Sequence, residues 1–135
     1  MKKLLSINYS AGAFNFAMLL LRLFSGGLIM HHGYGKLVGF SDMQHKFINF
    51  MGIGTTASLA LVVFAEFFCG LFIIIGLFTR LASIPLIITM CVILFKVAHW
   101  QVFEDGEMAT LYLGTFLTLL IVGPGKVSVD AMMGK

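Results

Sequence analysis

The sequence predicts an all-α fold: a single domain, residues 1–135, built as an integral membrane four-helix transmembrane bundle. Composition is the first reason. With 59% hydrophobic residues, only 11% charged residues and a mean hydropathy of +1.00, the chain lacks the charged surface that a soluble domain of this size needs. The second reason is that the apolar residues form long runs without polar alternation, which disfavours membrane strands.

About 20 apolar residues span a bilayer, and four runs are judged against that length. We expect helices over about residues 11–33, 55–78, 81–99 and 107–122. The first run follows the basic pair Lys2-Lys3 and has no small-residue cleavage site, so we interpret it as an uncleaved helix and not as a signal peptide. The second begins after the glycines Gly52 and Gly54, which interrupt helices.

The third run follows the tight turn Thr79-Arg80, so it is expected to form a hairpin with the second. Pro85 lies in its first turn, where a missing amide hydrogen costs little. The fourth run is short and contains Thr110, Thr115 and Thr118, which makes it the weakest of the predicted spans.

The distribution of lysine and arginine predicts the orientation. Four spans place both termini on one side, and that side carries more of the basic residues: Lys2, Lys3, Arg80, Lys126 and Lys135, against Lys36, Lys46 and Lys96 on the other. The positive-inside rule therefore puts both termini in the cytoplasm. The cations are scattered, not gathered into a patch, so no nucleic acid partner is expected.

Two charged residues, Arg22 and Glu66, stand within the apolar runs, where an isolated charge is costly and often functional. Each shares a helical stripe with small or apolar residues, so both are expected to face inward: Arg22, Gly26, Ile29 and Gly33 on one helix, and Glu66, Cys69, Gly70 and Ile73 on the other. Counted from Gly33 and Thr55, the two charges reach similar depth, which allows an Arg22–Glu66 ion pair. Such a pair would either fix helix register or mark a ligand or proton site.

The cysteines and histidines give weaker signals. Cys69 and Cys91 do not form a CxxC motif and stand in apolar surroundings, so they are interpreted as buried core side chains, a redox pair being the alternative. His31, His32, Asp42, His45, His99 and Glu104 are ligand types without a recognised metal-binding spacing. No metal site is expected.

The polar residues, taken in order, resemble those of a known family. Arg22-Leu23, His32-Gly33-Tyr34-Gly35-Lys36-Leu37, Glu66 with Gly70 and Gly76, Thr79-Arg80-Leu81-Ala82, Gly106-Glu107, and Gly123-Pro124-Gly125 with Ser128 and Asp130 are similar to the pattern of the DoxX family. This family comprises small four-helix bacterial membrane proteins. Val127 departs from the pattern, because an aromatic residue is frequent there in relatives.

The resemblance implies a multi-pass protein of the bacterial inner membrane linked to redox, sulfur or oxidative-stress chemistry. Members of the family are linked to such chemistry, for example through a thiosulfate:quinone oxidoreductase whose membrane subunit is DoxX-like. No covalently bound cofactor is implied, and a quinone is the expected ligand. Electrons would come from a soluble redox partner, since the chain has no cofactor motif. The enzyme class would be an oxidoreductase subunit that is inactive without that partner.

The positions that match the family suggest roles. The expected catalytic residues are His32, Glu107, Glu66 and Arg22; the expected substrate-binding residues are Arg22, Lys36, Glu66 and Thr110. Thr110 comes from the helical spacing and not from the family pattern, because it shares a face of the fourth run with Glu107, Gly114 and Thr118, and this face would give the cavity a polar wall. His32 or Glu107 would exchange protons, since histidine titrates near neutral pH, while Lys36 or Arg22 would steady the anionic reduced quinone and Glu66 would compensate Arg22. Arg80 and Asp130 are assigned to structure or topology.

Two other functions stay open. A non-catalytic scaffold would use its buried charges to hold the bundle and its loops to recruit a soluble enzyme to the bilayer. A transporter of a small solute would also need intramembrane charges, and with four spans it would have to form a homo-oligomer.

Overall fold

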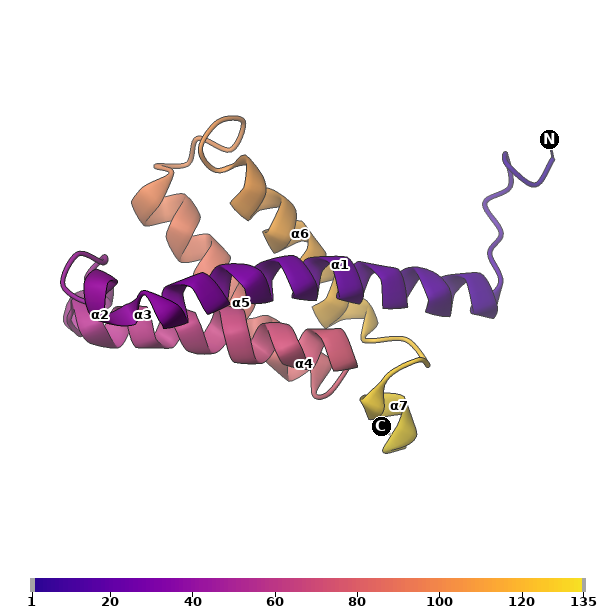
Figure 1. The fold of residues 1–135 in the computed structure, drawn as a ribbon. Coiled ribbons are helices and arrows are strands. Elements are labelled where there is room, and N and C mark those ends of the chain that lie inside the picture. The colour runs from indigo at the N-terminus through magenta and orange to yellow at the C-terminus, as the bar shows by residue number, and fades with distance from the viewer. Residues whose placement is uncertain (1, 135) are drawn as a thin grey trace.

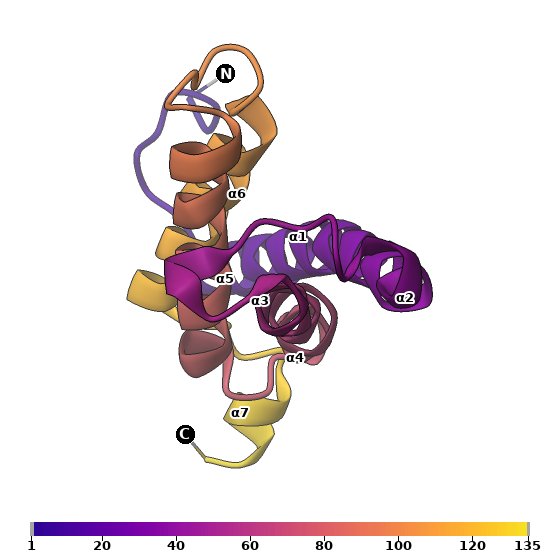
Figure 2. The same ribbon diagram turned by 90° about the vertical axis from the view of Figure 1, so that its left-hand side faces the viewer.

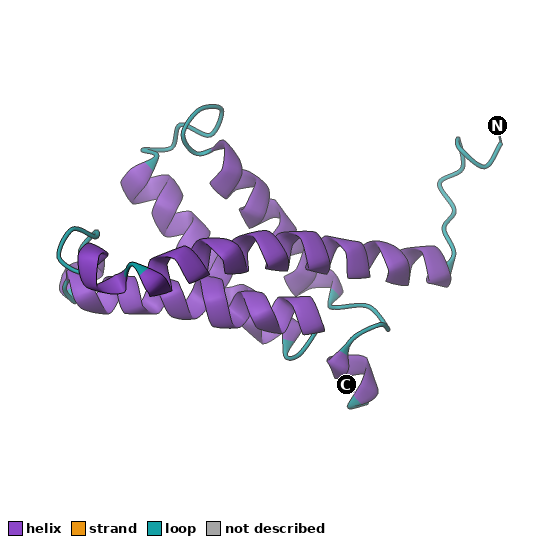
Figure 3. Ribbon diagram, viewed as in Figure 1, coloured by secondary structure: helices purple, strands orange, loops and turns teal. Residues whose placement is uncertain are grey.

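The computed structural model describes residues 2–134, and all of its regular structure in that range is helical (Figure 3). The elements run as follows: α1 Ala11–Val38, α2 Phe40–Met43, η1 Phe50–Gly52, α3 Thr55–Val63, η2 Phe64–Cys69, α4 Gly70–Ile75, α5 Thr79–Val92, η3 Ile93–Val97, α6 Glu107–Val122 and α7 Val129–Met132. The segments η2 and η3 are π-helical and continue the α-helices beside them. The predicted all-α class is confirmed.

The long helices form two antiparallel pairs. Helix α1 lies along the rod made by α3, η2 and α4, and α5 with η3 lies along α6 (Figure 1). The second pair crosses the first obliquely, as the view along α1 shows (Figure 2). The loops after α1 and after η3 lie at one end of the bundle, here called the loop end; the α4–α5 turn, α7 and both termini lie toward the other, the terminal end (Figure 1).

Three helices are long and apolar enough to cross a membrane: Ala11–Val38, Thr55–Ile75 and Thr79–Val97. Helix α6 is also apolar but has 16 residues, about 24 Å at 1.5 Å per residue, against a hydrocarbon core of about 30 Å. The helical membrane bundle is therefore confirmed, with α6 as its shortest member.

Both predicted inward faces are confirmed. Arg22, Gly26, Ile29 and Gly33 are buried on α1, and Glu66, Cys69, Gly70 and Ile73 are buried on the facing rod. The glycines allow close approach: a Cβ on Gly33 would come 2.5 Å from the amide nitrogen of Phe67, and one on Gly26 would come 2.7 Å from Ile74 Cγ1. Small residues at helix contacts have this effect throughout membrane bundles.

Helix α1 ends at Val38, not near Gly33 as expected. It begins at the N-cap Ser10, whose hydroxyl accepts from the Ala13 amide, and continues through Gly33 and Gly35. Gly33 stays helical because it packs directly on Glu66 and Phe67, so tertiary packing outweighs the low helix propensity of glycine. The extra turn places Lys36 within the helix.

Candidate functional site: an ion pair beside a polar cleft

A partly buried ion pair joins α1 to the π-helical segment η2. The Nζ of Lys36 lies 2.6 Å from Oε2 of Glu66 and donates a hydrogen bond to it. The Glu66 side chain is only 2% exposed and that of Lys36 is 23% exposed, so the pair opens to its surroundings on the lysine side. π-Helical turns are often found at functional sites, and η2 carries the carboxylate.

The pair forms one wall of a cleft of about 150 Å³ toward the loop end. Its polar lining consists of His32 and Lys36 from α1, Glu66 from η2, Asp105 from the loop before α6, and Tyr112 from α6. Apolar side chains complete it, among them Met90 from α5 and Ile93 from η3. Both π-helical segments therefore contribute to one cleft.

Aromatic rings close a side of this cleft. Tyr112 meets His32 edge-on, with ring centroids 6.4 Å apart and planes at 89°, and stacks on Phe116 at 5.8 Å and 8°. Phe116 is fully buried and backs the tyrosine, so the phenol ring is held in one orientation. The cleft thus combines an ammonium, two carboxylates, an imidazole and a phenol around a space lined elsewhere by apolar groups.

Arg22 lies away from this cleft, at the terminal end. Its guanidinium donates to four backbone carbonyls: Nε to Ile73 at 3.1 Å, Nη2 to Ile74 at 3.0 Å, and Nη1 to Pro124 at 2.9 Å and Val127 at 2.6 Å. The expected Arg22–Glu66 pair is therefore wrong. Because α1 continues past Gly33, Arg22 reaches the C-terminal end of α4, while Lys36 arrives at the depth of Glu66.

Asp130 complements Arg22 at the same end. Its Oδ1 accepts from the Phe78 amide at 2.8 Å and its Oδ2 from the Thr79 amide at 2.9 Å, so the carboxylate caps the first turn of α5. Arg80 is exposed and donates from Nη2 to the Val122 carbonyl at 3.3 Å. Arg22 and Asp130 together tie the α4–α5 turn to the segment after α6.

Comparison with known proteins agrees with this architecture. A model of the DoxX family matches residues 17–100, more than half of the chain. The chain belongs to the DoxX family. It is also 29% identical over 124 residues to the inner membrane protein YqjF of Escherichia coli (strain K12), an alignment that covers 87% of this chain and 92% of that protein. No solved structure matches.

The family membership and the apolar helices confirm a multi-pass protein of the bacterial inner membrane. The matched residues include the cleft-lining His32, Lys36 and Glu66, together with Arg22. The cleft of this DoxX-family protein also draws on α6, which lies beyond the match.

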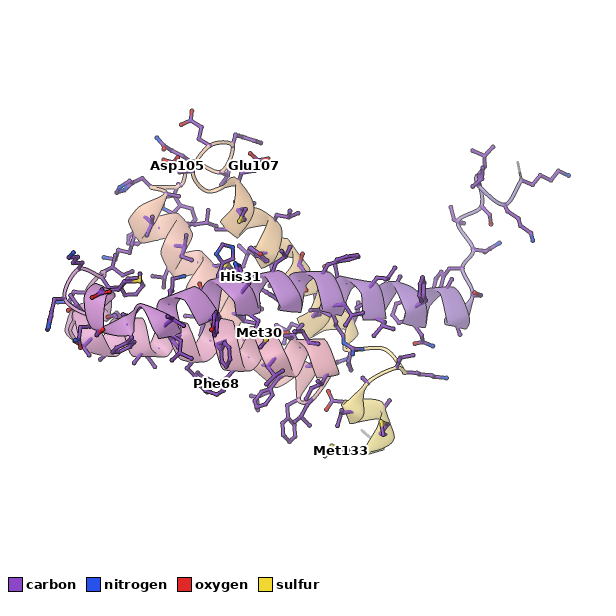
Figure 4. All side chains as sticks on the ribbon, viewed as in Figure 1. Met30, His31, Phe68, Asp105, Glu107 and Met133 are labelled. Atoms are coloured by element: carbon purple, nitrogen blue, oxygen red, sulfur yellow. The ribbon has the colours of Figure 1, made fainter. Side chains whose placement is uncertain are left out.

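Two residues expected in the site lie outside the cleft lining of this DoxX-family protein. Glu107 is exposed at the start of α6, near the loop that carries Asp105 (Figure 4). Thr110 is exposed too, and its hydroxyl donates to the Gly106 carbonyl at 2.7 Å. The threonines on α6 bond to their own helix backbone, so the polar wall expected along this helix is absent from the described cleft.

Sequence reasoning missed Tyr112 and Asp105. Tyr112 shares a stripe with the buried residues Ala109, Phe116 and Leu119, so the inward face of α6 was identifiable from its apolar spacing. Asp105 gives no comparable signal, since it is one of several acids in an exposed loop. As for the cysteines, Cys69 is buried as expected, whereas Cys91 is exposed, and both are free thiols.

Proposed function

We propose that this DoxX-family protein is the membrane subunit of a quinone-linked redox complex and that the cleft beside the Lys36–Glu66 pair binds the quinone head. The observation that carries the proposal is an ion pair between the buried Glu66 carboxylate and the partly exposed Lys36 ammonium, within apolar helices and beside a cleft that His32 also lines. Ionisable groups inside membrane bundles commonly serve ligand or proton sites.

The size and lining suit a single ring. A cavity of about 150 Å³ holds a benzene molecule in a soluble protein, so a cleft of about 150 Å³ accommodates one six-membered head. Tyr112 offers a flat aromatic wall, and the apolar lining from Met90 and Ile93 matches the ring faces. A tail would leave toward the lipid.

The charges fit the reduced state. Reduction of a quinone to a quinol takes two electrons and two protons, and the electrons would be supplied by a soluble oxidoreductase partner at the membrane. The Lys36 ammonium stabilises the oxyanion that forms when electrons arrive first, and His32, on the exposed side of the cleft, delivers protons. Glu66 compensates Lys36 when the cleft is empty. Arg22 takes no part in this scheme, because carbonyls already bind its guanidinium.

The test is the quinone content of protein purified gently from its native membrane, measured by extraction and mass spectrometry, alongside identification of co-purifying proteins. We expect wild-type protein to carry quinone and the Lys36→Met and Glu66→Gln variants to lose most of it. Glu104→Gln, which removes an exposed loop carboxylate outside the cleft, is the matched control and should retain it.

Recovery of a soluble oxidoreductase with the wild-type protein would further support the redox assignment. Protein that carries no quinone, but still retains a soluble partner in wild-type and variant form, would overturn the quinone site and favour the scaffold. Equal quinone content in all variants would also overturn it.

A further inference from the structure

A second site lies at the terminal end, opposite the cleft. A groove of about 470 Å³ runs between the start of α5 and the turn after α6. Its charged lining comprises Arg80, Lys126 and Asp130. Within residues 2–134 neither basic side chain forms a salt bridge, whereas both Asp130 oxygens are engaged by backbone amides. The groove therefore carries two cations and one carboxylate, and its net charge is positive.

Glycines build the turn that forms one wall of the groove. Gly123 and Gly125 have φ angles of 91° and 81°, a conformation that favours glycine, and they form the turn that follows α6. A Cβ on Gly123 would come 3.3 Å from Arg80 Nε, so the absence of a side chain at this position leaves room for the guanidinium. The Lys126 amide donates to Asn15 Oδ1 at 3.0 Å, which fixes the backbone of the lysine against α1.

An apolar cleft continues from this groove. It has a volume of about 310 Å³ and shares the side chains Phe78 and Leu81 with the groove. From there it follows the junction between α5 and the rod made by α3, η2 and α4, past Phe72 and Ile84 to Pro85 and Phe64. A charged groove at the terminal end thus shares two lining side chains with an apolar cleft that follows α5 away from that end.

We propose that this groove and cleft bind one anionic phospholipid, with its phosphate between Arg80 and Lys126 and an acyl chain in the cleft. Basic side chains next to the bilayer attract anionic lipid headgroups, and a guanidinium is suited to phosphate oxygens. The apolar continuation selects a lipid over a free phosphate ion, because inorganic phosphate has nothing to place there. The proposal does not rest on the quinone site, with which it shares no lining residue.

The experiment uses full-length protein in nanodiscs that contain equal amounts of phosphatidylglycerol and phosphatidylcholine. Native mass spectrometry of the released protein gives the ratio of the two bound lipids. Wild-type protein should be enriched in phosphatidylglycerol. Each of Arg80→Gln and Lys126→Gln should lower the ratio about fivefold, and the double variant about 30-fold. Lys46→Gln, in the loop after α2, is the control and should leave the ratio unchanged.

A second arm separates a lipid from a free anion. Ile84→Trp fills the apolar cleft, whereas Ile88→Trp lies one turn later on α5 and outside it. Only the first should reduce lipid retention, and excess inorganic phosphate should not displace the lipid. An unchanged ratio in the double variant would overturn the proposal. So would displacement by phosphate together with full retention in Ile84→Trp, which would assign the groove to a free anion.

Discussion

The two basic residues on the inner face of α1 have different hydrogen-bond partners. Lys36 has a carboxylate partner, whereas within residues 2–134 the hydrogen bonds of the Arg22 guanidinium go to four carbonyl oxygens. A guanidinium presents five N–H donors in a rigid fork, so it can serve several acceptors at once, and carbonyls at a helix C-terminus carry partial negative charge. Arg22 thus acts as a polar joint between α1, α4 and the segment after α6.

We predict that Arg22→Lys destabilises the protein by about 2 kcal/mol although it keeps the charge. A lysine ammonium has three donors, so at least one of the four carbonyls loses its partner, and a buried unsatisfied polar group costs about 1–3 kcal/mol. Thermal unfolding in detergent, followed by circular dichroism, measures the change. Arg80→Lys, at an exposed arginine with one long hydrogen bond, should stay within about 0.5 kcal/mol of wild type. Equal effects at both sites would contradict the joint.

For the Lys36–Glu66 pair, we predict that stability and quinone binding can be changed independently. Lys36→Met leaves a buried carboxylate without its partner and should cost about 3 kcal/mol, whereas the double variant Lys36→Met/Glu66→Leu should recover most of that loss. Quinone content should be low in both variants. The same unfolding measurement, with lipid extraction of each sample, checks this prediction. A double variant as unstable as the single one would show that the pair is not coupled.

At the scale of elements, glycines determine how closely α1 approaches the rod made by α3, η2 and α4. Gly33→Ala should destabilise the bundle by about 1–3 kcal/mol, because the new Cβ would lie 2.5 Å from the Phe67 amide nitrogen. Gly27→Ala, on the same helix with nothing within 4 Å of its Cβ position, should be neutral or up to about 1 kcal/mol stabilising. Denaturant titration of the two variants in mixed micelles makes the comparison. The prediction fails if both behave alike.

The same glycine explains where prediction from the sequence stops. Hydropathy and 3.6-residue spacing predict that the helices form, that the chain is a membrane protein, and that Arg22 and Glu66 face inward. They do not predict the end of α1, because Gly33 and Gly35 have the composition of a helix break, whereas Gly33 packs closely against Glu66 and Phe67 and the helix continues through both glycines to Val38. Ending the first helix near Gly33 misjudges how deep each of its residues lies relative to the facing rod. The Glu66 carboxylate was therefore expected to pair with Arg22 instead of Lys36.

Loop residues are a second limit. Asp105 lines the cleft from the loop between η3 and α6, in which His99 and Trp100 have φ angles of 50° and 63°. Its turn includes Gly106, whose Cβ position is 2.7 Å from Leu94 Cδ2. Such a path depends on tertiary contacts that no local pattern encodes.

For the whole molecule, both ends of the described chain lie toward the same end of the bundle (Figure 1), which suits an even number of crossings. We predict that green fluorescent protein fused to the C-terminus fluoresces, that alkaline phosphatase fused there is inactive, and that phosphatase inserted after Asp105 is active. An N-terminal reporter serves as the control. An active C-terminal phosphatase with a cytoplasmic N-terminus would mean that the 16 residues of α6 do not cross the bilayer.

The carbonyl joint of Arg22 also sets an order of events during biosynthesis. Pro124 and Val127 lie 102 and 105 residues after the arginine. At about 5–20 residues per second, the ribosome adds them at least about five seconds after the arginine itself. Until then the guanidinium lacks two of its four carbonyl acceptors, so the joint at the terminal end stays incomplete. The joint therefore closes only after the segment that follows α6 has been made.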